Sequence, residues 1–248
     1  MRRFKLFLPI LILIFYAFPS WGQSPDMVLA KVDSVQNAFE DMTANETMTL
    51  IGRGGNQKER KVRINQKGSE LRMVRFLEPA DVRGVGFLRL ASDRLYLYLP
   101  AFRKVRRIAS SATNENFMGT DFTYEDMSRS SYSEDYIAQD LSMENGQYRL
   151  LLEPQPHADV NYHHLIIFAD TSNYVLRKVE FYDGEEEKIK ELTIDNVEKI
   201  DGYWMGKVMR MKSLDKNHET VMELSDIRFD QGLSDREFSE RSLKRPIR

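Results

Sequence analysis

Apart from an irregular stretch between about residues 109 and 148, the chain from residue 46 to residue 229 consists of short runs in which apolar and polar residues alternate, and this period of two restricts the fold more than any other feature. Residues 61–64, for example, place valine and isoleucine on one face of a strand and lysine and arginine on the other. Turn residues such as Asp183-Gly184 and Asp201-Gly202 separate successive runs, as they do in β-hairpins. The pattern therefore predicts consecutive antiparallel strands.

A sheet of about a dozen such strands is expected to curl, because curling or near-closure protects the edges that a flat sheet would expose. No repeat of roughly 20–50 residues and no long linker divides the chain. We therefore expect one domain over residues 23–248, mainly β with few helices, whose strands form an antiparallel meander.

A single helix is predicted before the strands. Ser24-Pro25-Asp26 combines an N-cap serine, a proline at the first helical position and an acid in the first turn. Apolar residues then recur at Val28, Val32, Val35, Phe39 and Met42. This spacing predicts an amphipathic helix from about Pro25 to about Asp41, and its apolar stripe is expected to lie across the open sheet.

The first 22 residues have the pattern of a cleaved signal peptide. Residues 2–5 carry three positive charges, and the apolar run 6–18 is too short for the roughly 20 residues of a membrane-spanning helix. Small residues at Ser20 and Gly22 mark a cleavage site before Gln23. The sequence therefore predicts export from the cytoplasm.

Cysteine content and charge exclude several classes of protein. The chain has no cysteine, which excludes disulfides, thiolate metal sites and the lipid-bearing cysteine of a bacterial lipoprotein. Its 36 basic and 38 acidic residues give a net charge of −2, which argues against a nucleic-acid partner.

Some of the predicted strands are apolar in a way that suggests an internal cavity. Leucines at three alternate positions oppose Tyr96 and Tyr98, and three of the twelve methionines share one face of the strand near residue 208. The interior is filled either by the helix or by a ligand, and a methionine wall suits a ligand of variable shape because the thioether chain repacks easily. The cavity candidates are Val32, Phe39, Leu95, Leu97, Leu99, Met205, Met209 and Met211.

A cluster of positive charge follows Pro100. The cationic cluster consists of Arg103, Lys104, Arg106 and Arg107. One interpretation is a solvated edge strand, which such charges protect from aggregation. The other is a docking surface for an acidic partner or for anionic lipid headgroups.

The segment 117–127 mixes aromatic side chains and carboxylates, so it does not fit a simple strand face. Its candidate functional residues are Phe117, Met118, Gly119, Asp121, Tyr124, Glu125 and Asp126. One interpretation is a structural loop whose aromatic rings plug one end of the barrel while its acids cap a turn or pair with arginines. The alternative is a gate or docking loop at the mouth of the cavity.

Signs of catalysis or metal binding are missing from the sequence. His163 and His164 are adjacent, so on a strand they face opposite ways, and no zinc-site spacing is present. The sequence also lacks a nucleophile elbow, a Walker loop and a dinucleotide fingerprint. We therefore expect no enzyme activity, no metal and no cofactor.

Four stretches of the sequence resemble a known family. They are Gly86-Phe-Leu-Arg-Leu90, Asp93-Arg-Leu-Tyr-Leu-Tyr-Leu-Pro100, Arg103-Lys-Val-Arg-Arg-Ile108 and Phe117-Met-Gly-Thr-Asp-Phe-Thr-Tyr-Glu-Asp-Met127. Together they are similar to the outer membrane lipoprotein-sorting protein family, a branch of the LolA/LolB-like superfamily. The resemblance implies an unclosed antiparallel β half-barrel with helices over its concave apolar face.

The resemblance also implies a function. In LolA-type carriers the cavity takes lipoprotein acyl chains across the periplasm, and members of this branch are often encoded beside RND-type transporters. We therefore expect a monomeric periplasmic carrier or chaperone for a lipid or an acylated lipoprotein, working with an RND-type inner-membrane transporter or an outer-membrane acceptor. The alternative is a docking or sensor subunit of an envelope transport or stress system that carries no lipid.

Overall fold

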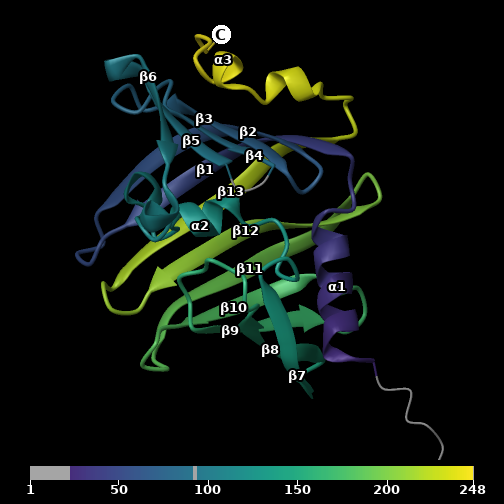
Figure 1. Cartoon of the computed structure of the whole chain (residues 1–248). Coiled ribbons are helices and arrows are strands. Elements are labelled where there is room, and N and C mark those ends of the chain that lie inside the picture. The colour runs from purple at the N-terminus through teal and green to yellow at the C-terminus, as the bar shows by residue number, and fades with distance from the viewer. Residues whose placement is uncertain (1–22, 92–93, 248) are drawn as a thin grey trace, which may run out of the picture.

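The computed structural model describes residues 23–91 and 94–247, and one antiparallel sheet of 13 strands dominates it (Figure 1). The strands are β1 (Asp41–Ile51), β2 (Gln57–Lys67), β3 (Leu71–Glu78), β4 (Gly86–Leu90), β5 (Arg94–Leu99), β6 (Lys104–Ile108), β7 (Tyr136–Glu144), β8 (Gln147–Pro154), β9 (His164–Asp170), β10 (Leu176–Tyr182), β11 (Lys188–Ile200), β12 (Tyr203–Ser213) and β13 (His218–Phe229). The helices are α1 (Pro25–Gln36), α2 (Tyr124–Ser128) and α3 (Glu240–Leu243), with short 3-10 turns η1 (Pro100–Phe102), η2 (Ser110–Ala112), η3 (Phe117–Gly119) and η4 (Asp235–Glu237).

The order of the strands shows an open meander in which the first and the last strand of the chain pair with each other at the centre of the sheet. The order is β6-β5-β4-β3-β2-β1-β13-β12-β11-β10-β9-β8-β7, so each strand pairs with a neighbour in the chain except where β1 pairs with β13. At that junction Met48 lies opposite Met222. Because β6 and β7 form two separate edges, the sheet is not closed, and the expected mainly β, unclosed antiparallel half-barrel is confirmed.

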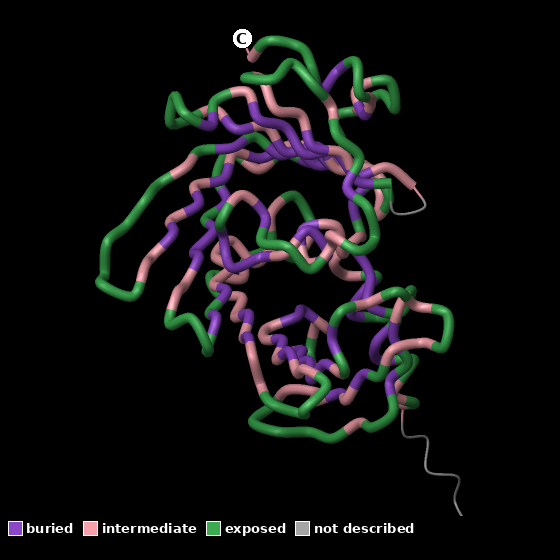
Figure 2. Tube along the Cα trace, turned by 60° about the vertical axis from the view of Figure 1, so that its left-hand side comes forward, coloured by how far each residue is buried: buried purple, intermediate pink, exposed green. Residues whose placement is uncertain are grey.

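The segment between β6 and β7 crosses the hollow of the sheet. These strands follow each other in the chain but lie at opposite edges, so residues 109–135, which include α2, must cross from one edge to the other. Figure 1 shows α2 between the two halves of the sheet. In Figure 2 the buried residues follow the inner sides of the tube, whereas the hairpin tips are exposed. We call residues 109–135 the crossing segment.

Helix α1 begins as predicted, but the predicted C-terminal end is wrong. Ser24 caps the helix by accepting a hydrogen bond from the Met27 amide at 3.2 Å. The helix ends at Gln36, because the Asn37 amide turns back to the Asp33 carbonyl and the strand β1 already begins at Asp41. The helix packs against β7, β8 and β12, and its buried apolar residues join the main core.

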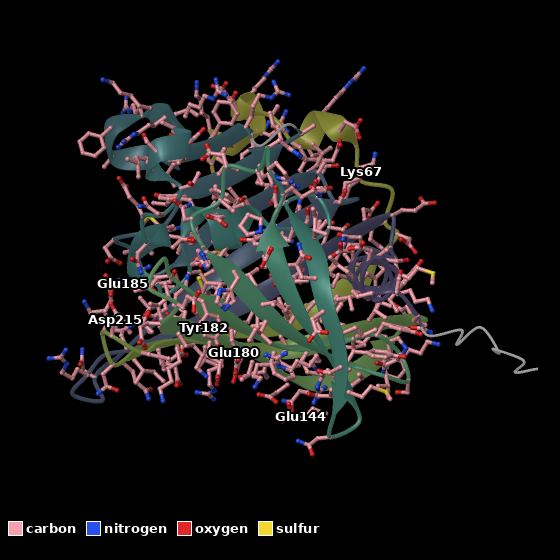
Figure 3. The ribbon with its side chains drawn as sticks, turned by 60° about the horizontal axis from the view of Figure 1, so that its bottom comes forward. Lys67, Glu144, Glu180, Tyr182, Glu185 and Asp215 are labelled. Atoms are coloured by element: carbon pink, nitrogen blue, oxygen red, sulfur yellow. The ribbon has the colours of Figure 1, made fainter. Side chains whose placement is uncertain are left out.

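The C-terminal segment covers part of the outer face. A small second core joins Met73 and Leu88 of the sheet to Phe238 and Leu243. Gly86 allows this close contact, since a Cβ atom there would approach the Leu243 Cδ1 atom to 2.6 Å and would force that side chain to shift. Polar side chains also lie on the outer face, as on β10, where the Tyr182 hydroxyl donates to Glu180 at 3.2 Å (Figure 3).

The strand β7 was missed in the sequence, which we had interpreted as irregular between residues 109 and 148. As an edge strand it buries fewer side chains, and Met143 is 75% exposed. The predicted signal peptide, residues 1–22, lies outside the described residues. Over residues 23–91 and 94–247, no helix combines the length and the apolar character needed to cross a membrane.

Candidate functional site

A cavity of about 230 Å³ lies between the inner face of the sheet and the crossing segment. Its walls come from both halves of the sheet, through β1–β3 and β10–β13, and from the end of α1. The lining is mainly apolar, and six methionines contribute to it: Met42, Met127, Met205, Met209, Met211 and Met222. Because unbranched thioether chains adapt their shape, this wall suits an apolar ligand of variable form.

Four of the eight predicted cavity residues line this space. Phe39, Met205, Met209 and Met211 do so. Val32 is fully buried in the core and does not reach the cavity lining.

The leucines of β5 lie elsewhere. Leu95 is buried and lines a second, more polar cavity of about 750 Å³ beside the crossing segment. Leu97 is buried and Leu99 half-buried against the main core, and neither lines either of these two cavities. The candidate set for the methionine-lined cavity therefore narrows to Phe39 and the three methionines of β12.

One side of the cavity carries a fully paired buried acid. Asp126 of α2 forms an ion pair of 2.6 Å with Lys190 of β11 and accepts a hydrogen bond of 2.9 Å from the Tyr162 hydroxyl. It also caps its own helix, where its carboxylate accepts from the Thr123 amide at 2.8 Å. Burial is the largest single influence and works to raise the pKa of Asp126, but the Lys190 ammonium and the hydrogen bonds from Thr123 and Tyr162 together leave that pKa below its usual value.

A second group of charges lies next to it on the crossing segment. Arg129 pairs with Glu125 and, at 3.2 Å, with Asp135. The other Glu125 oxygen accepts from the Asn161 amide at 3.0 Å. Burial raises the pKa of Glu125, and the Arg129 guanidinium partly opposes that effect. The acids of this segment are thus held by contacts within the protein.

The opposite wall carries a buried acid without a partner. Glu46 of β1 is 3% exposed and lines the cavity. Its Oε1 atom is buried and accepts no hydrogen bond from any described residue. Burial raises the pKa of Glu46 from 4.5 to about 7, although Arg72 partly lowers it. An unsatisfied buried carboxylate is costly, so this atom is a candidate contact for a ligand.

Arg72 of β3 is the charged residue that lowers the pKa of Glu46, and it also donates hydrogen bonds to other residues. Its Nε and Nη2 atoms donate to the Gln66 side-chain oxygen at 3.1 and 2.8 Å, and its Nη1 atom donates to the Met127 carbonyl at 3.1 Å. Burial, reinforced by Arg89, lowers the pKa of Arg72 to about 10. Arg72 therefore ties the sheet to the crossing segment beside the cavity.

The remaining residues of the motif 117–127 hold the crossing segment to the sheet. The Phe117 ring packs against Phe87 and Tyr124, with centroids 5.4 and 5.7 Å apart. Asp121 is bonded at 2.7 Å to both His218 and Thr220 of β13.

The backbone of the same motif turns sharply at Met118 and Gly119. Met118 and Gly119 have positive φ values of 49° and 77°. The Met118 carbonyl accepts a hydrogen bond from Arg60 of β2. Phe122, Asp126 and Met127 then reach the cavity lining.

The cationic cluster lies on the unpaired edge of the sheet. Arg103, Lys104, Arg106 and Arg107 are all exposed on or beside β6. None of the four forms an ion pair with a residue of the described chain. The cluster is therefore accessible to a partner from solvent.

The histidines and acids of the described residues lack the arrangement that a metal site needs. Within residues 23–91 and 94–247, no group of three or more histidine, aspartate or glutamate side chains is placed to hold a metal ion. His163 and His164 contact each other, with their Nδ1 atoms 3.0 Å apart, on the exposed side of the sheet.

Sequence reasoning missed Glu46 and Arg72, although one signal was present. Positions 42, 44, 46, 48 and 50 share one face of β1, and four of these five are apolar. A glutamate at the centre of an inward-facing series is the exception that the alternation could have revealed.

Comparison with known proteins gives a family model, described as an uncharacterised protein, that matches residues 68–245. Among solved structures, a DUF1329 family protein from Desulfovibrio piger is 27% identical, with a TM-score of 0.81 over 88% of this chain and 97% of that chain. A domain described as that of an outer membrane lipoprotein-sorting protein from Vibrio parahaemolyticus is 29% identical, with a TM-score of 0.79 over the same shares of 88% and 97%.

A LolA superfamily protein from Nitrosomonas europaea is 19% identical, with a TM-score of 0.75 over 89% of this chain and 100% of that chain. No curated protein matches the sequence. The resemblance that the sequence motifs indicated, to LolA-like lipoprotein-sorting proteins, is confirmed.

Proposed function

Since the chain belongs to the family of uncharacterised proteins whose model spans residues 68–245, and since its fold is that of the LolA superfamily, we propose that it is a periplasmic carrier for a lipid or lipid-modified cargo. The observation that carries the proposal is the methionine-lined cavity between the sheet and the crossing segment. The proposal includes no catalytic step, metal or cofactor.

Burial of acyl chain in this cavity would drive binding. Each methylene group removed from water contributes about 0.8 kcal/mol before the cost of ordering the chain. The cavity walls belong to both halves of the sheet and to the crossing segment, so a bound chain would contact all three. Release would then require these parts to separate, a step for which an RND-type transporter or an outer-membrane acceptor is the proposed partner.

Binding of an environment-sensitive fluorescent lipid probe to the purified protein, and its displacement by envelope lipid extract, tests this proposal. Met209→Trp would fill the cavity from β12 and should weaken probe binding at least tenfold. Met143→Trp is the matched control, because Met143 is 75% exposed on the edge strand β7. Absence of probe binding to folded wild-type protein would contradict the carrier function.

Export is part of the proposal and has its own test. N-terminal sequencing of the protein from the cell envelope should begin at or near Gln23, as the predicted cleavage site requires. Recovery of the chain with an intact Met1 from the cytoplasm would contradict it.

A second candidate function is a docking or sensor subunit of an envelope system. The observation that favours it is the cationic cluster, which is exposed on the unpaired edge strand β6. Such a surface would bind anionic lipid headgroups or an acidic partner. A protein that binds anionic surfaces through β6 but takes no lipid probe into the cavity would support this second function.

A further inference from the structure

Glu46 differs from every other buried acid that the structure describes. Asp33 accepts from the Tyr132 and Ser133 amides at 2.8 Å, and Asp41 accepts from two amides of residues 231–233 at 2.8 Å. Asp121 and Glu125 are also bonded, as described above. Glu46 alone among these buried acids has an oxygen that no described group reaches.

The immediate neighbours of Glu46 in the sheet are apolar, although Gln66, Arg72 and the unpaired amide nitrogen of Gln36 line the same cavity. Val62 of β2 and Leu224 of β13 lie directly opposite it on the two neighbouring strands. Ala44 and Met48 precede and follow it on the inward face of β1. The carboxyl group therefore emerges from an apolar wall, and the open direction is the cavity that it lines.

A buried acceptor in this position has a definite preference among ligands. A ligand group that donates a hydrogen bond to Oε1 would satisfy the carboxylate, and a bond to a charged group contributes about 1.5–3 kcal/mol. To an ionised Glu46, a ligand carboxylate would instead bring like charge inside an apolar wall, which is unfavourable. Arg72 spends three of its five N–H groups on protein oxygens, and its positive charge already acts on Glu46, whose pKa it partly lowers.

We propose that Glu46 is the polar recognition point of the cavity, and that the cargo is an amphiphile whose polar end brings a hydroxyl, amide N–H or ammonium donor to it. This inference rests on the proposed carrier function and names the chemical class of its cargo. It distinguishes such cargo from free fatty acids, whose carboxylate cannot donate when ionised.

A matched pair of ligands tests the inference. Displacement of a neutral fluorescent probe is measured with 1-decanol and with its isomer methyl nonyl ether, which has the same atoms but no donor. At pH 8, above the pKa of Glu46, the wild-type protein should bind the alcohol about tenfold more tightly than the ether, since one hydrogen bond to a charged group is of that size. In Glu46→Leu the two ligands should bind alike.

Two further variants make the result specific. Glu46→Gln retains an acceptor oxygen and should keep part of the preference for the alcohol. Glu223→Leu is the matched control, because Glu223 is an exposed acid on the neighbouring strand β13, and it should leave the preference intact. Thermal melting of each variant establishes that it is folded.

Equal binding of alcohol and ether to the wild-type protein would overturn the inference while leaving the carrier function in place. A preference for the alcohol that survives in Glu46→Leu would also overturn it, because another group would then be the acceptor. If neither ligand nor the probe binds folded wild-type protein, both the carrier function and this inference fail.

Discussion

Two walls of the same cavity each carry a buried carboxylate, but only one of the two carboxylates is fully hydrogen-bonded. We call the wall with Asp126 the paired wall and the wall with Glu46 the unpaired wall. On the side of α2, Asp126 is surrounded by Lys190, Tyr162 and the Thr123 amide. On the side of β1, Glu46 has an oxygen without any partner among the described residues. This difference shows that a buried charge alone does not identify a ligand site, because a buried charge that is paired within the protein stabilises the fold. An unpaired buried acceptor that faces a cavity is the feature that we propose as a ligand contact.

The largest expected effect comes from breaking the paired wall. Lys190→Met would leave Asp126 buried without its cation, and removing one partner of a buried ion pair typically lowers the free energy of unfolding by about 3–5 kcal/mol. Urea unfolding monitored by circular dichroism measures it. Lys188→Met is the matched control, since the Lys188 pairs with Glu180 and Glu191 are partly exposed and should be worth under about 1 kcal/mol. Similar losses in the two variants would contradict the distinction.

On the unpaired wall, removal of the buried acid Glu46 should raise the free energy of unfolding instead of lowering it. Because the pKa of Glu46 is raised from 4.5 to about 7, the folded protein binds more protons than the unfolded chain between these values. The stability contribution of Glu46 is therefore greatest below pH 4.5, falls as the pH rises to about 7, and stays low above it. The loss is about 3 kcal/mol.

Glu46→Leu should consequently be more stable than the wild type by about 3 kcal/mol at pH 8, with a smaller gain at pH 4. Urea unfolding at both pH values measures the two differences. A variant that is less stable than the wild type at pH 8 would show that Glu46 has a partner that holds it ionised.

A smaller loss of stability is expected when Asp126 loses one hydrogen bond but keeps its ion pair. Tyr162→Phe removes the hydroxyl that donates to Asp126 but leaves the ion pair with Lys190, so the unfolding free energy should fall by about 1–2 kcal/mol. Tyr182→Phe is the control, because its hydrogen bond to Glu180 lies on the outer face of β10 and should be worth less than about 0.5 kcal/mol.

The smallest effect on stability is expected where charges lie in water. Replacing all four residues of the cationic cluster with glutamine should leave the unfolding free energy within about 0.5 kcal/mol of the wild type. Co-sedimentation with vesicles containing anionic lipid should nevertheless decrease in this variant, and wild-type binding should weaken with added salt. Salt-independent binding that is unchanged in the variant would assign the cluster to edge protection alone.

Local pattern predicted much of the fold. The alternation of residues 61–64 and the turn at Asp183-Gly184 identified strands because period and turn chemistry are properties of neighbouring residues. The end of α1 was misplaced at about Asp41, because Phe39 and Met42 continue the helical spacing although the chain has already turned at Asn37. The edge strand β7 was missed because an edge strand buries too few side chains to show the pattern clearly.

The candidate site was less predictable, because it depends on contacts between distant parts of the chain. That β6 and β7 lie at opposite edges follows from the pairing of β1 with β13, which no local pattern reveals. The same pairing sends Asp126 across the hollow to Lys190. The methionines of β12 were identified from alternation alone, since one strand is enough to place them on a common face.

The pairing of β1 with β13 has a consequence for the order of folding. Every other strand pair joins neighbours in the chain and closes a short loop, whereas this pair brings Met48 against Met222. Closing such a long loop is slower and entropically costlier than forming a hairpin. We expect the two meanders β1–β6 and β7–β13 to begin forming separately and to join only when β13 becomes available. A chain threaded through a narrow export channel from its N-terminus would thus complete its sheet only after nearly all of it had emerged.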